Sequence, residues 1–376
     1  MSGLVKAKKY DWKDSNMVLV GSETDRKVKK ASAETEPAWK QAGKKPGIQI
    51  WRINKFKVTT WPTDDYGSFY SGDSYIILNT YKDEQGDKLL YDVHFWIGKE
   101  STQDEYGTAA YKTVELDTLL DDVPVQHREV QGYESDLFKS YFPKITYWKG
   151  GVDSGFRHVT PENYRPRLLQ IKGKGKQVEA KEITLKKSKI TSDDVFILDD
   201  GTCLYQFNGK TCNKDEKYKA SQLLRDLKSQ RPKCRSEIVD EEDDDELVQK
   251  FFKAVDEADM KVDDDDDDDE VKTPTIVTGP PSLYRLTDSG GQLAFSKTKE
   301  GHDISKKDFK SNDVFILDTL KDLFVWIGKN ASETEKGNGL TYAHNYLMKS
   351  PHPFLPVTCL KEGMESKAFQ TAITAY

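Results

Sequence analysis

Short apolar runs recur along the chain in a fixed order, separated by polar segments. One phrase, SDDVFILD at 192–199, returns as SNDVFILD at 311–318, and a looser copy, SGDSYIILN, lies at 71–79. In each copy an acidic residue precedes a run rich in β-branched and aromatic residues, which is typical of a buried central strand. The repetition predicts three copies of one structural unit.

Each phrase is followed by a second apolar run that ends at a glycine. These runs are VHFWIG at 93–98, LYQFNG at 204–209 and LFVWIG at 323–328. A helix-start pattern comes next, with a glutamate nine positions beyond the aromatic of the second run: Glu105, Glu216 and Glu335. The order predicts α/β (α+β) domains, each with a central mixed sheet packed between a long and a short helix.

The length of 376 residues suits three such domains. Seven consecutive aspartates at 263–269 predict a solvated linker, because like charges in a block repel one another. The first residues are polar and lysine-rich, with a possible short strand at 17–21, and we expect them to wrap the first domain. The predicted units are an extension at 1–45, domains at 46–157, 158–262 and 282–376, and an acidic linker at 263–281.

Charge and composition exclude several classes of protein. The net charge of −7 and pI of about 5.6 argue against binding to nucleic acid. The sequence has neither a secretory signal nor an apolar run long enough for a membrane helix, so we expect a cytoplasmic protein. The four cysteines lack CxxC spacing, which argues against a structural zinc site and gives no evidence for disulfides.

The repeated carboxylates predict calcium sites. Calcium prefers six to eight oxygen ligands from carboxylates and carbonyls and tolerates irregular geometry. Each repeat offers an aspartate at the strand entrance, the carbonyl of the residue before it and the helix glutamate. The strand aspartates are Asp73, Asp194 and Asp313, and the carbonyls are those of Gly72, Asp193 and Asn312.

A structural alternative exists for the glutamates. Thr102, Asn213 and Ser332 each precede one of them by three positions, which is the spacing of a capping box. Capping alone would not require an aspartate at a fixed strand position in every repeat, so the pattern favours the metal site.

Catalysis has less support in the sequence. Acid–base chemistry needs one pocket rather than three copies of a carboxylate pair, and no Ser-His-Asp, phosphate-loop or Cys-His signature is present. We expect His94 and His127 to be hydrogen-bonded structural residues, and we expect a protein that is not an enzyme.

Longer ordered motifs resemble a known family. GIQIWRINKFKVTTWP at 47–62 and DVHFWIGKESTQDEYGTAA at 92–110 are similar to the first segment of gelsolin-superfamily proteins. RPRLLQIKGKGK at 165–176 resembles the second segment, and the third unit resembles the third segment. From about residue 45 onward the chain resembles the three-segment, severin- or fragmin-like members of that superfamily.

The resemblance implies further site residues. Val152 would join Gly72, Asp73 and Glu105 in the first domain's internal calcium site. Asp117, with the carbonyls of Asp122 and Pro124, would hold a second ion shared with actin, although the family usually has glycine where this chain has Asp122. The long helix would enter a cleft of actin through Gln103, Ala109, Ala110, Tyr111, Val114, Leu119 and Leu120. A basic edge would contact filament sides or phosphoinositides through Arg165, Arg167, Lys172, Lys174 and Lys176.

The resemblance also implies an activity. It implies a monomeric protein that binds actin monomers and filaments, severs filaments in calcium, caps their barbed ends and promotes nucleation. In this view, calcium opens a compact arrangement of domains and exposes the long helix. Two alternatives stay open: a capping protein that does not sever, and a calcium-binding acidic scaffold that does not remodel filaments.

Overall fold

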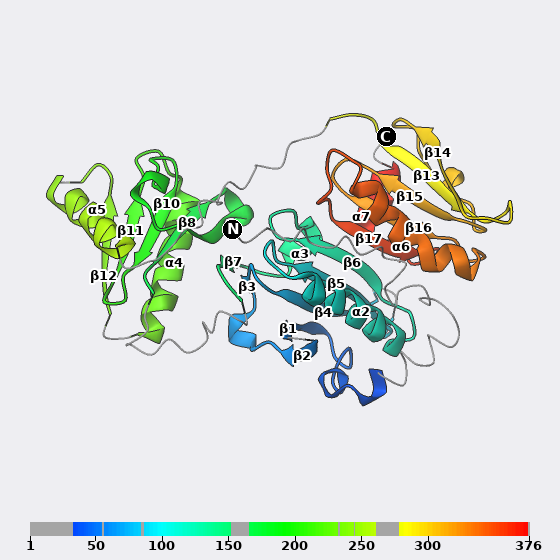
Figure 1. Ribbon diagram of the computed structural model, residues 1–376, viewed down its shortest axis with the longest axis horizontal. Coiled ribbons are helices and arrows are strands. Elements are labelled where there is room, and N and C mark those ends of the chain that lie inside the picture. The colour runs from blue at the N-terminus through cyan, green and yellow to red at the C-terminus, as the bar shows by residue number, and fades with distance from the viewer. Residues whose placement is uncertain are drawn as a thin grey trace, which may run out of the picture.

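A computed structural model describes residues 33–374, apart from 55, 84–85, 152–164, 232–233, 244 and 261–277. The possible strand at 17–21, Val152 and the aspartates at 263–269 lie outside the described residues, and so does the side chain of Glu105. The remainder forms three similar units, built on two sheets (Figure 1).

The first unit begins with a 3-10 turn at Pro37–Trp39 and has two helices, α2 at Gln103–Leu119 and α3 at Asp136–Ser140. Its strands are β1 (Gly47–Asn54), β2 (Lys57–Thr60), β3 (Ser68–Tyr70), β4 (Ser74–Lys82), β5 (Leu89–Ile97), β6 (Val125–Val130) and β7 (Ile145–Trp148). Strand β4 pairs antiparallel with β1 and β5, and β6 joins parallel to β5, so the sheet is mixed.

The other two units repeat this pairing. The second contains β8 (Arg167–Lys172), β9 (Glu179–Ile183), β10 (Val195–Asp199), β11 (Cys203–Asn208), α4 (Lys214–Gln230), β12 (Arg235–Asp240) and α5 (Asp245–Asp259). The third contains β13 (Ser282–Thr287), β14 (Ala294–Glu300), β15 (Val314–Asp318), β16 (Leu323–Ile327), α6 (Glu333–Leu347), β17 (Val357–Lys361) and α7 (Lys367–Thr374). In both, two antiparallel pairings are followed by a parallel one.

Helices cover both faces of each sheet, as the sequence predicted. In the second unit, Leu223 of α4 packs on one face and Phe251 of α5 packs on the other. Because these strands are covered on both sides, every residue of β10 and β15 is buried, which explains the unbroken apolar phrase VFILD. The second helix of this unit, α5, has 15 residues and is nearly as long as α4, which has 17.

The units share their sheets. Strand β6 of the first unit pairs antiparallel with β17 of the third, giving a ten-stranded sheet in the order β14-β13-β15-β16-β17-β6-β5-β4-β1-β2. Strand β7 pairs parallel with β9 of the second unit, within a seven-stranded sheet in the order β12-β11-β10-β8-β9-β7-β3. Hydrogen-bonded edge strands therefore connect the first unit to both of the others.

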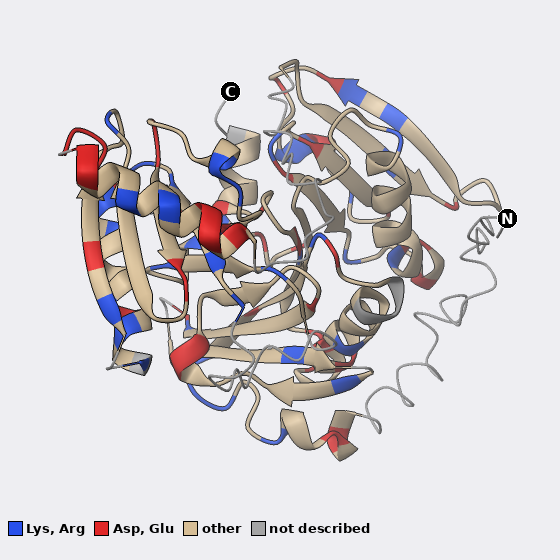
Figure 2. Ribbon diagram, turned by 60° about the vertical axis from the view of Figure 1, so that its left-hand side comes forward, with Lys and Arg blue, Asp and Glu red and all other residues tan. Residues whose placement is uncertain are grey.

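Acidic and basic residues are interspersed over the described ribbons (Figure 2). The described part of the N-terminal extension packs on the first unit, where Trp39 is buried beside Trp51. The Trp39 indole nitrogen donates to Glu115 of α2 at 2.8 Å, which fixes this segment against the long helix.

Candidate cation sites

A buried carboxylate lies at the entrance of the central strand in all three units. Asp73, Asp194 and Asp313 are 0%, 2% and 3% exposed. A buried charge is costly unless it is paired and hydrogen-bonded. Each aspartate accordingly has a polar partner on the first strand of its own unit: Arg52 for Asp73, Gln170 for Asp194 and Arg285 for Asp313.

The glycine that ends the second apolar run closes the same loop in every unit. The backbone N–H groups of Gly98, Gly209 and Gly328 donate to the carbonyls of Asp73, Asp194 and Asp313 at 2.9, 3.1 and 3.1 Å. A Cβ at these glycines would lie 2.3 to 2.4 Å from the carbonyl oxygen of Ser71, Ser192 or Ser311. Only glycine permits this approach, which brings the start of the long helix beside the strand entrance.

Glu216 and Glu335 form the capping boxes that the sequence offered as the alternative. Both carboxylate oxygens of Glu216 accept backbone N–H groups, from Gly173 at 2.9 Å and Asn213 at 3.0 Å. Glu335 does the same with Asp288 at 2.7 Å and Ser332 at 3.0 Å. An ionised carboxylate has about four lone-pair sites, so capping leaves acceptor capacity for a cation.

Aspartate and glutamate converge in the second and third units. Lys172 bonds to Asp194 at 3.1 Å while the adjacent Gly173 bonds to Glu216. The Asp193 side chain lies on the exposed side, and its nearest oxygen is 4.0 Å from the Lys172 ammonium. The third unit has a similar arrangement. Arg285 donates to Asp313, and the backbone N–H of Asp288 donates to Glu335. The candidate ligand atoms are all oxygens, and the carboxylates of Asp194, Glu216, Asp313 and Glu335 are buried, a set that fits calcium.

The first unit offers a similar strand entrance. The N–H of Gly72 donates to the carbonyl of Gly150 at 2.8 Å, which brings the segment before Val152 next to the strand. A Cβ at Gly151 would lie 2.6 Å from Asp73 Oδ1, so this backbone passes directly over the carboxylate.

A second cluster lies at the end of α2. The Asp117 carboxylate is buried and accepts from the Gln126 amide at 2.8 Å, and the N–H of Asp122 donates to the Asp117 carbonyl at 2.9 Å. Asp122 has a φ of 56°, in the left-handed region that favours glycine and is tolerated by aspartate. Pro124 is buried next to β6. The carbonyl of Asp122 accepts from the ammonium of Lys361, which belongs to the third unit.

The candidate actin-contacting residues of α2 divide between core and surface. Ala109 is fully buried in the core of the first unit, so including it in a binding surface was wrong for this arrangement. Leu119 and Leu120 also pack against that core. Tyr111 is 45% exposed, and Ala110 and Val114 are half-buried beside it. The side chain of Gln103 lies outside the described residues.

The basic residues around β8 have mixed environments. Arg167 pairs with Asp199 at 3.3 Å and lies over the Trp148 ring at 4.9 Å, while the Lys172 ammonium lies on Asp194. Arg165 is half-buried and Lys174 is exposed, and the side chain of Lys176 lies outside the described residues. Arg167 and Lys172 are therefore engaged in ion pairs within the second unit.

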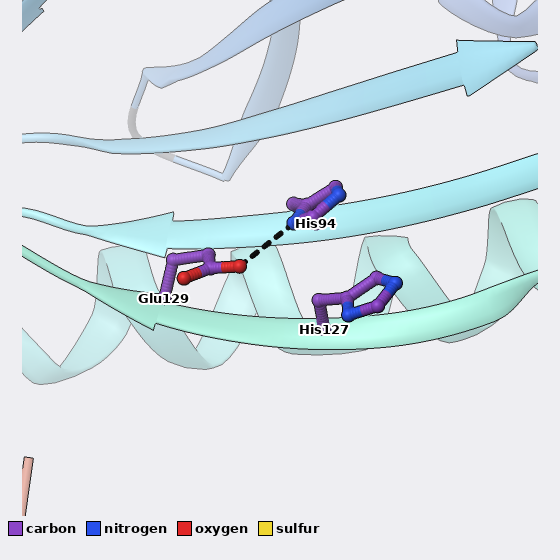
Figure 3. A group of neighbouring side chains, drawn as sticks. All are labelled: His94, His127 and Glu129. Carbon is purple, nitrogen blue, oxygen red and sulfur yellow. Dashed lines mark hydrogen bonds and ion pairs between the residues drawn. The ribbon is translucent and has the colours of Figure 1, made fainter. Parts of the chain in front are cut away.

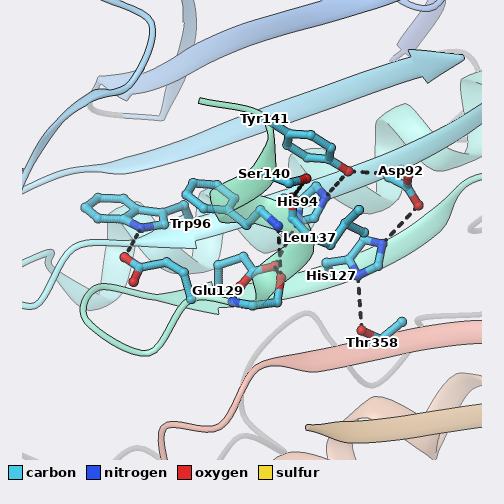
Figure 4. A network of polar contacts seen from close by, with 12 residues as sticks. Asp92, His94, Trp96, His127, Glu129, Leu137, Ser140, Tyr141 and Thr358 are labelled. Carbon is cyan, nitrogen blue, oxygen red and sulfur yellow. Dashed lines mark hydrogen bonds and ion pairs between the residues drawn. The ribbon is translucent and has the colours of Figure 1, made fainter. Parts of the chain in front are cut away.

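His94, His127 and Glu129 form a third cluster, inside the first unit (Figure 3). The two imidazole rings stack with centroids 4.2 Å apart, and His94 Nδ1 lies 2.9 Å from Glu129 Oε1. The other ring nitrogens contact Tyr141, Asp92 and, across the unit boundary, Thr358 (Figure 4). All four ring nitrogens are engaged, which supports the structural role that the sequence predicted and leaves none for a metal ion.

This network makes stability depend on pH. Burial, with a smaller contribution from His127, holds the pKa of His94 well below its usual value. The unfolded chain therefore binds a proton that the folded chain does not, and the free energy of unfolding falls as pH drops below about 6.5. Urea unfolding between pH 8 and pH 5 tests this. The free energy of unfolding of His94→Gln should fall by up to about 1.4 kcal/mol less per pH unit than that of the parent protein.

Thr59→Gln, at an exposed position of β2 in the same unit, supplies the control, since it changes no titratable group and should keep the parent's pH dependence. Burial raises the pKa of Glu129 and raises that of Glu134 to about 7, and these shifts favour folding at low pH instead. The difference between the variants therefore isolates His94. Equal slopes in the parent and in His94→Gln would contradict the assignment.

Comparison with known proteins identifies the class of these units. The gelsolin repeat family matches residues 58–139, 176–247 and 296–370. The chain belongs to this family and carries three of its repeats.

Particular relatives match most or all of this chain. Gelsolin-like protein 1 of Lumbricus terrestris is 51% identical over 376 residues, covering 100% of both chains. Severin of Echinococcus granulosus is 50% identical over 372 residues, covering 96% of both. Gelsolin of Gallus gallus is 37% identical over 335 residues, with 88% of this chain matching 42% of that protein. Among the described residues, no helix is both long and apolar enough to cross a membrane.

Proposed function

We propose that this protein is a calcium-regulated actin-binding protein that severs actin filaments and caps their barbed ends. Binding of monomers and promotion of nucleation belong to the same proposal, as does a place on the cytoplasmic actin cytoskeleton. The observation that carries it is the similarity of this three-repeat chain to a severin over 96% of both chains. No covalent chemistry is involved.

The arrangement of the first and third units supports regulation by opening. Strands β6 and β17 pair at three positions, and the contacts from His127 to Thr358 and from Lys361 to Asp122 reinforce the pairing. Half-buried Arg128 of β6 interacts electrostatically with Tyr106 of α2 and with His344 of α6. One residue of each long helix is therefore close enough to Arg128 to interact with its charge. Separation of the third unit would uncover the side of α2 that carries Tyr106, whereas Tyr111 is already 45% exposed and is the candidate aromatic anchor of this helix.

The candidate calcium ligands are the oxygen groups at the strand entrances and the helix starts. They are Gly72, Asp73, Glu105 and Val152 in the first unit, Asp193, Asp194 and Glu216 in the second, and Asn312, Asp313 and Glu335 in the third. When bound, calcium supplies a double positive charge to carboxylates that otherwise rely on the chain's own cations. Asp117 and the carbonyls of Asp122 and Pro124 form the candidate shared site, and Lys361 must leave Asp122 before that carbonyl can face another molecule.

A basic edge around β8 is the candidate contact for filament sides or phosphoinositides. Exposed Lys174 is available there, and Lys172 would become available on leaving Asp194. Each lysine near an anionic surface contributes about 1 kcal/mol, so such a cluster supports reversible competition by lipid rather than anchoring.

Direct microscopy of labelled actin filaments tests the proposal. We expect addition of the protein in calcium to break existing filaments within seconds to minutes and to arrest growth at barbed ends, whereas filaments in chelator stay intact. Arrested growth without new ends would assign capping alone. Filaments that behave identically in calcium and in chelator, together with a protein that does not co-sediment with filaments in calcium, would overturn the proposal and favour the acidic scaffold.

A further inference from the structure

The three repeats place equivalent side chains against their strand-entrance aspartates, and these side chains differ in charge. Arg52 of β1 is paired across the sheet with Tyr75, Gln170 of β8 with Phe196, and Arg285 of β13 with Phe315. In each unit the partner lies two residues beyond the aspartate. Register therefore makes Arg52, Gln170 and Arg285 the same position of the repeat.

At this position two units have a permanent cation and one has a neutral amide. Arg285 Nη2 lies 2.9 and 2.8 Å from the two oxygens of Asp313, and Arg52 forms a direct ion pair with Asp73. In the second unit the amide of Gln170 donates to Asp194 Oδ2 at 2.6 Å. A guanidinium at a cation site opposes a metal ion by charge repulsion and by occupying the carboxylate's lone pairs, whereas an amide opposes it only by the second route.

The second unit also has a cation, but a more mobile one. The Lys172 ammonium lies 3.1 Å from Asp194, and its side chain is 62% exposed. An exposed lysine on a flexible stem is screened by solvent and can swing away at little cost. It opposes a metal ion less than a confined arginine does.

The two arginines differ in how easily they can leave. The Arg52 side chain is 8% exposed and lies over the rings of Trp61 and Tyr70, at 5.3 and 5.0 Å. Losing Asp73 as a partner would leave this charge buried and uncompensated, which is strongly unfavourable. The Arg285 side chain is 39% exposed and can turn toward water.

We propose that the residue at this strand position sets the calcium affinity of each repeat, so that the second repeat fills first, the third next and the first last. This inference rests on the calcium sites of the proposed function and goes beyond it by assigning an order. The order follows the cost of displacing the chain's own cation: mobile Lys172, half-exposed Arg285, confined Arg52.

Exchange of the residues between repeats tests the inference on the full chain. Calcium binding would be measured by equilibrium dialysis without actin, and Glu216→Gln and Glu335→Gln would assign the classes of site. We expect Glu216→Gln to remove the tightest class. Gln170→Arg should lower the calcium affinity of that class at least tenfold. Arg285→Gln should raise the calcium affinity of the class assigned to the third repeat at least tenfold.

Matched controls change the same charges elsewhere. Arg235→Gln, at the exposed start of β12, and Gln370→Arg, on the exposed side of α7, should leave all affinities within twofold of the parent. Thermal unfolding checks that the variants fold, and if Arg285→Gln does not, Gln170→Arg decides alone.

The outcomes separate the inference from the proposed function. Suppose that Glu216→Gln removes one class of saturable calcium sites, but neither Gln170→Arg nor Arg285→Gln changes any affinity. That result would overturn the inference, while the proposed calcium sites would still be supported. A parent protein without saturable calcium binding would remove the calcium regulation itself.

Discussion

A disulfide between a cysteine introduced by Gln126→Cys and the native Cys359 should prevent the protein from severing actin filaments in calcium, and a reducing agent should restore severing. Gln126 of β6 faces Cys359 of β17 in the antiparallel pairing that joins the first and third units. Directly opposed residues of antiparallel strands have Cα atoms about 4.5 to 5.5 Å apart and side chains on one face, within the range that a disulfide spans. The cross-link would hold the junction closed, and we expect the severing rate to fall at least a hundredfold.

Formation of the bond needs an added oxidant. Burial raises the pKa of the Cys359 thiol to about 12, so little reactive thiolate is present at neutral pH. A mobility shift on non-reducing gels would verify the cross-link, and counting filament breaks by microscopy would give the severing rate.

Two control variants separate the bond from its side effects. Gln126→Ser also loses the amide contact to Asp117, yet it cannot be cross-linked and should sever in both redox states. Gln126→Cys combined with Cys359→Ser excludes bonds to other cysteines. Fully cross-linked protein that severs at the parent's rate would show that the junction need not open.

Replacing Trp39 by alanine should destabilise the first unit by about 3 to 5 kcal/mol, as for other large buried side chains. The indole is 2% exposed, contacts Trp51 edge-on with centroids 4.9 Å apart and donates to the buried carboxylate of Glu115. The substitution removes the ring and its hydrogen bond to Glu115, which keeps its contact with Lys112. Urea unfolding followed by tryptophan fluorescence would measure the loss.

Because the chain has three units, more than one transition is expected, and only that of the first unit should move. Lys40→Ala, at the exposed neighbouring position, should leave every transition in place. Trp39→Phe should fall between the parent and the alanine variant. An unchanged first transition in Trp39→Ala would mean that this segment does not contribute to the fold's stability.

Much of the fold could be predicted because the same pattern of apolar residues recurs in each of the three units. The phrase VFILD is buried on both faces, and the glycine after the second run is required because a Cβ there would lie 2.3 to 2.4 Å from a carbonyl oxygen. Such constraints act locally, so sequence alone reveals them. The strand aspartates could be found for the same reason, because their spacing to the helix glutamate is constant in two repeats.

Features that depend on contacts between units could not be predicted. Nothing in the sequence near Lys361 indicates that its ammonium reaches the carbonyl of Asp122, 239 positions earlier. The pairing of Gln126 with Cys359 also joins two ordinary strand edges. Ala109 was misplaced because helical spacing alone does not say which apolar residues face the domain's own sheet. Arg52 and Arg285 were missed, although their equivalent positions before each strand phrase could have revealed them.

The shared sheet has a consequence for handling the protein. Separation of β6 from β17 turns both into edge strands with unpaired backbone N–H and C=O groups, and such edge strands readily pair with extended segments of other molecules. At high concentration the calcium-loaded form should therefore associate through reciprocal exchange of third units between molecules, a route to dimers that dilution or chelation would reverse.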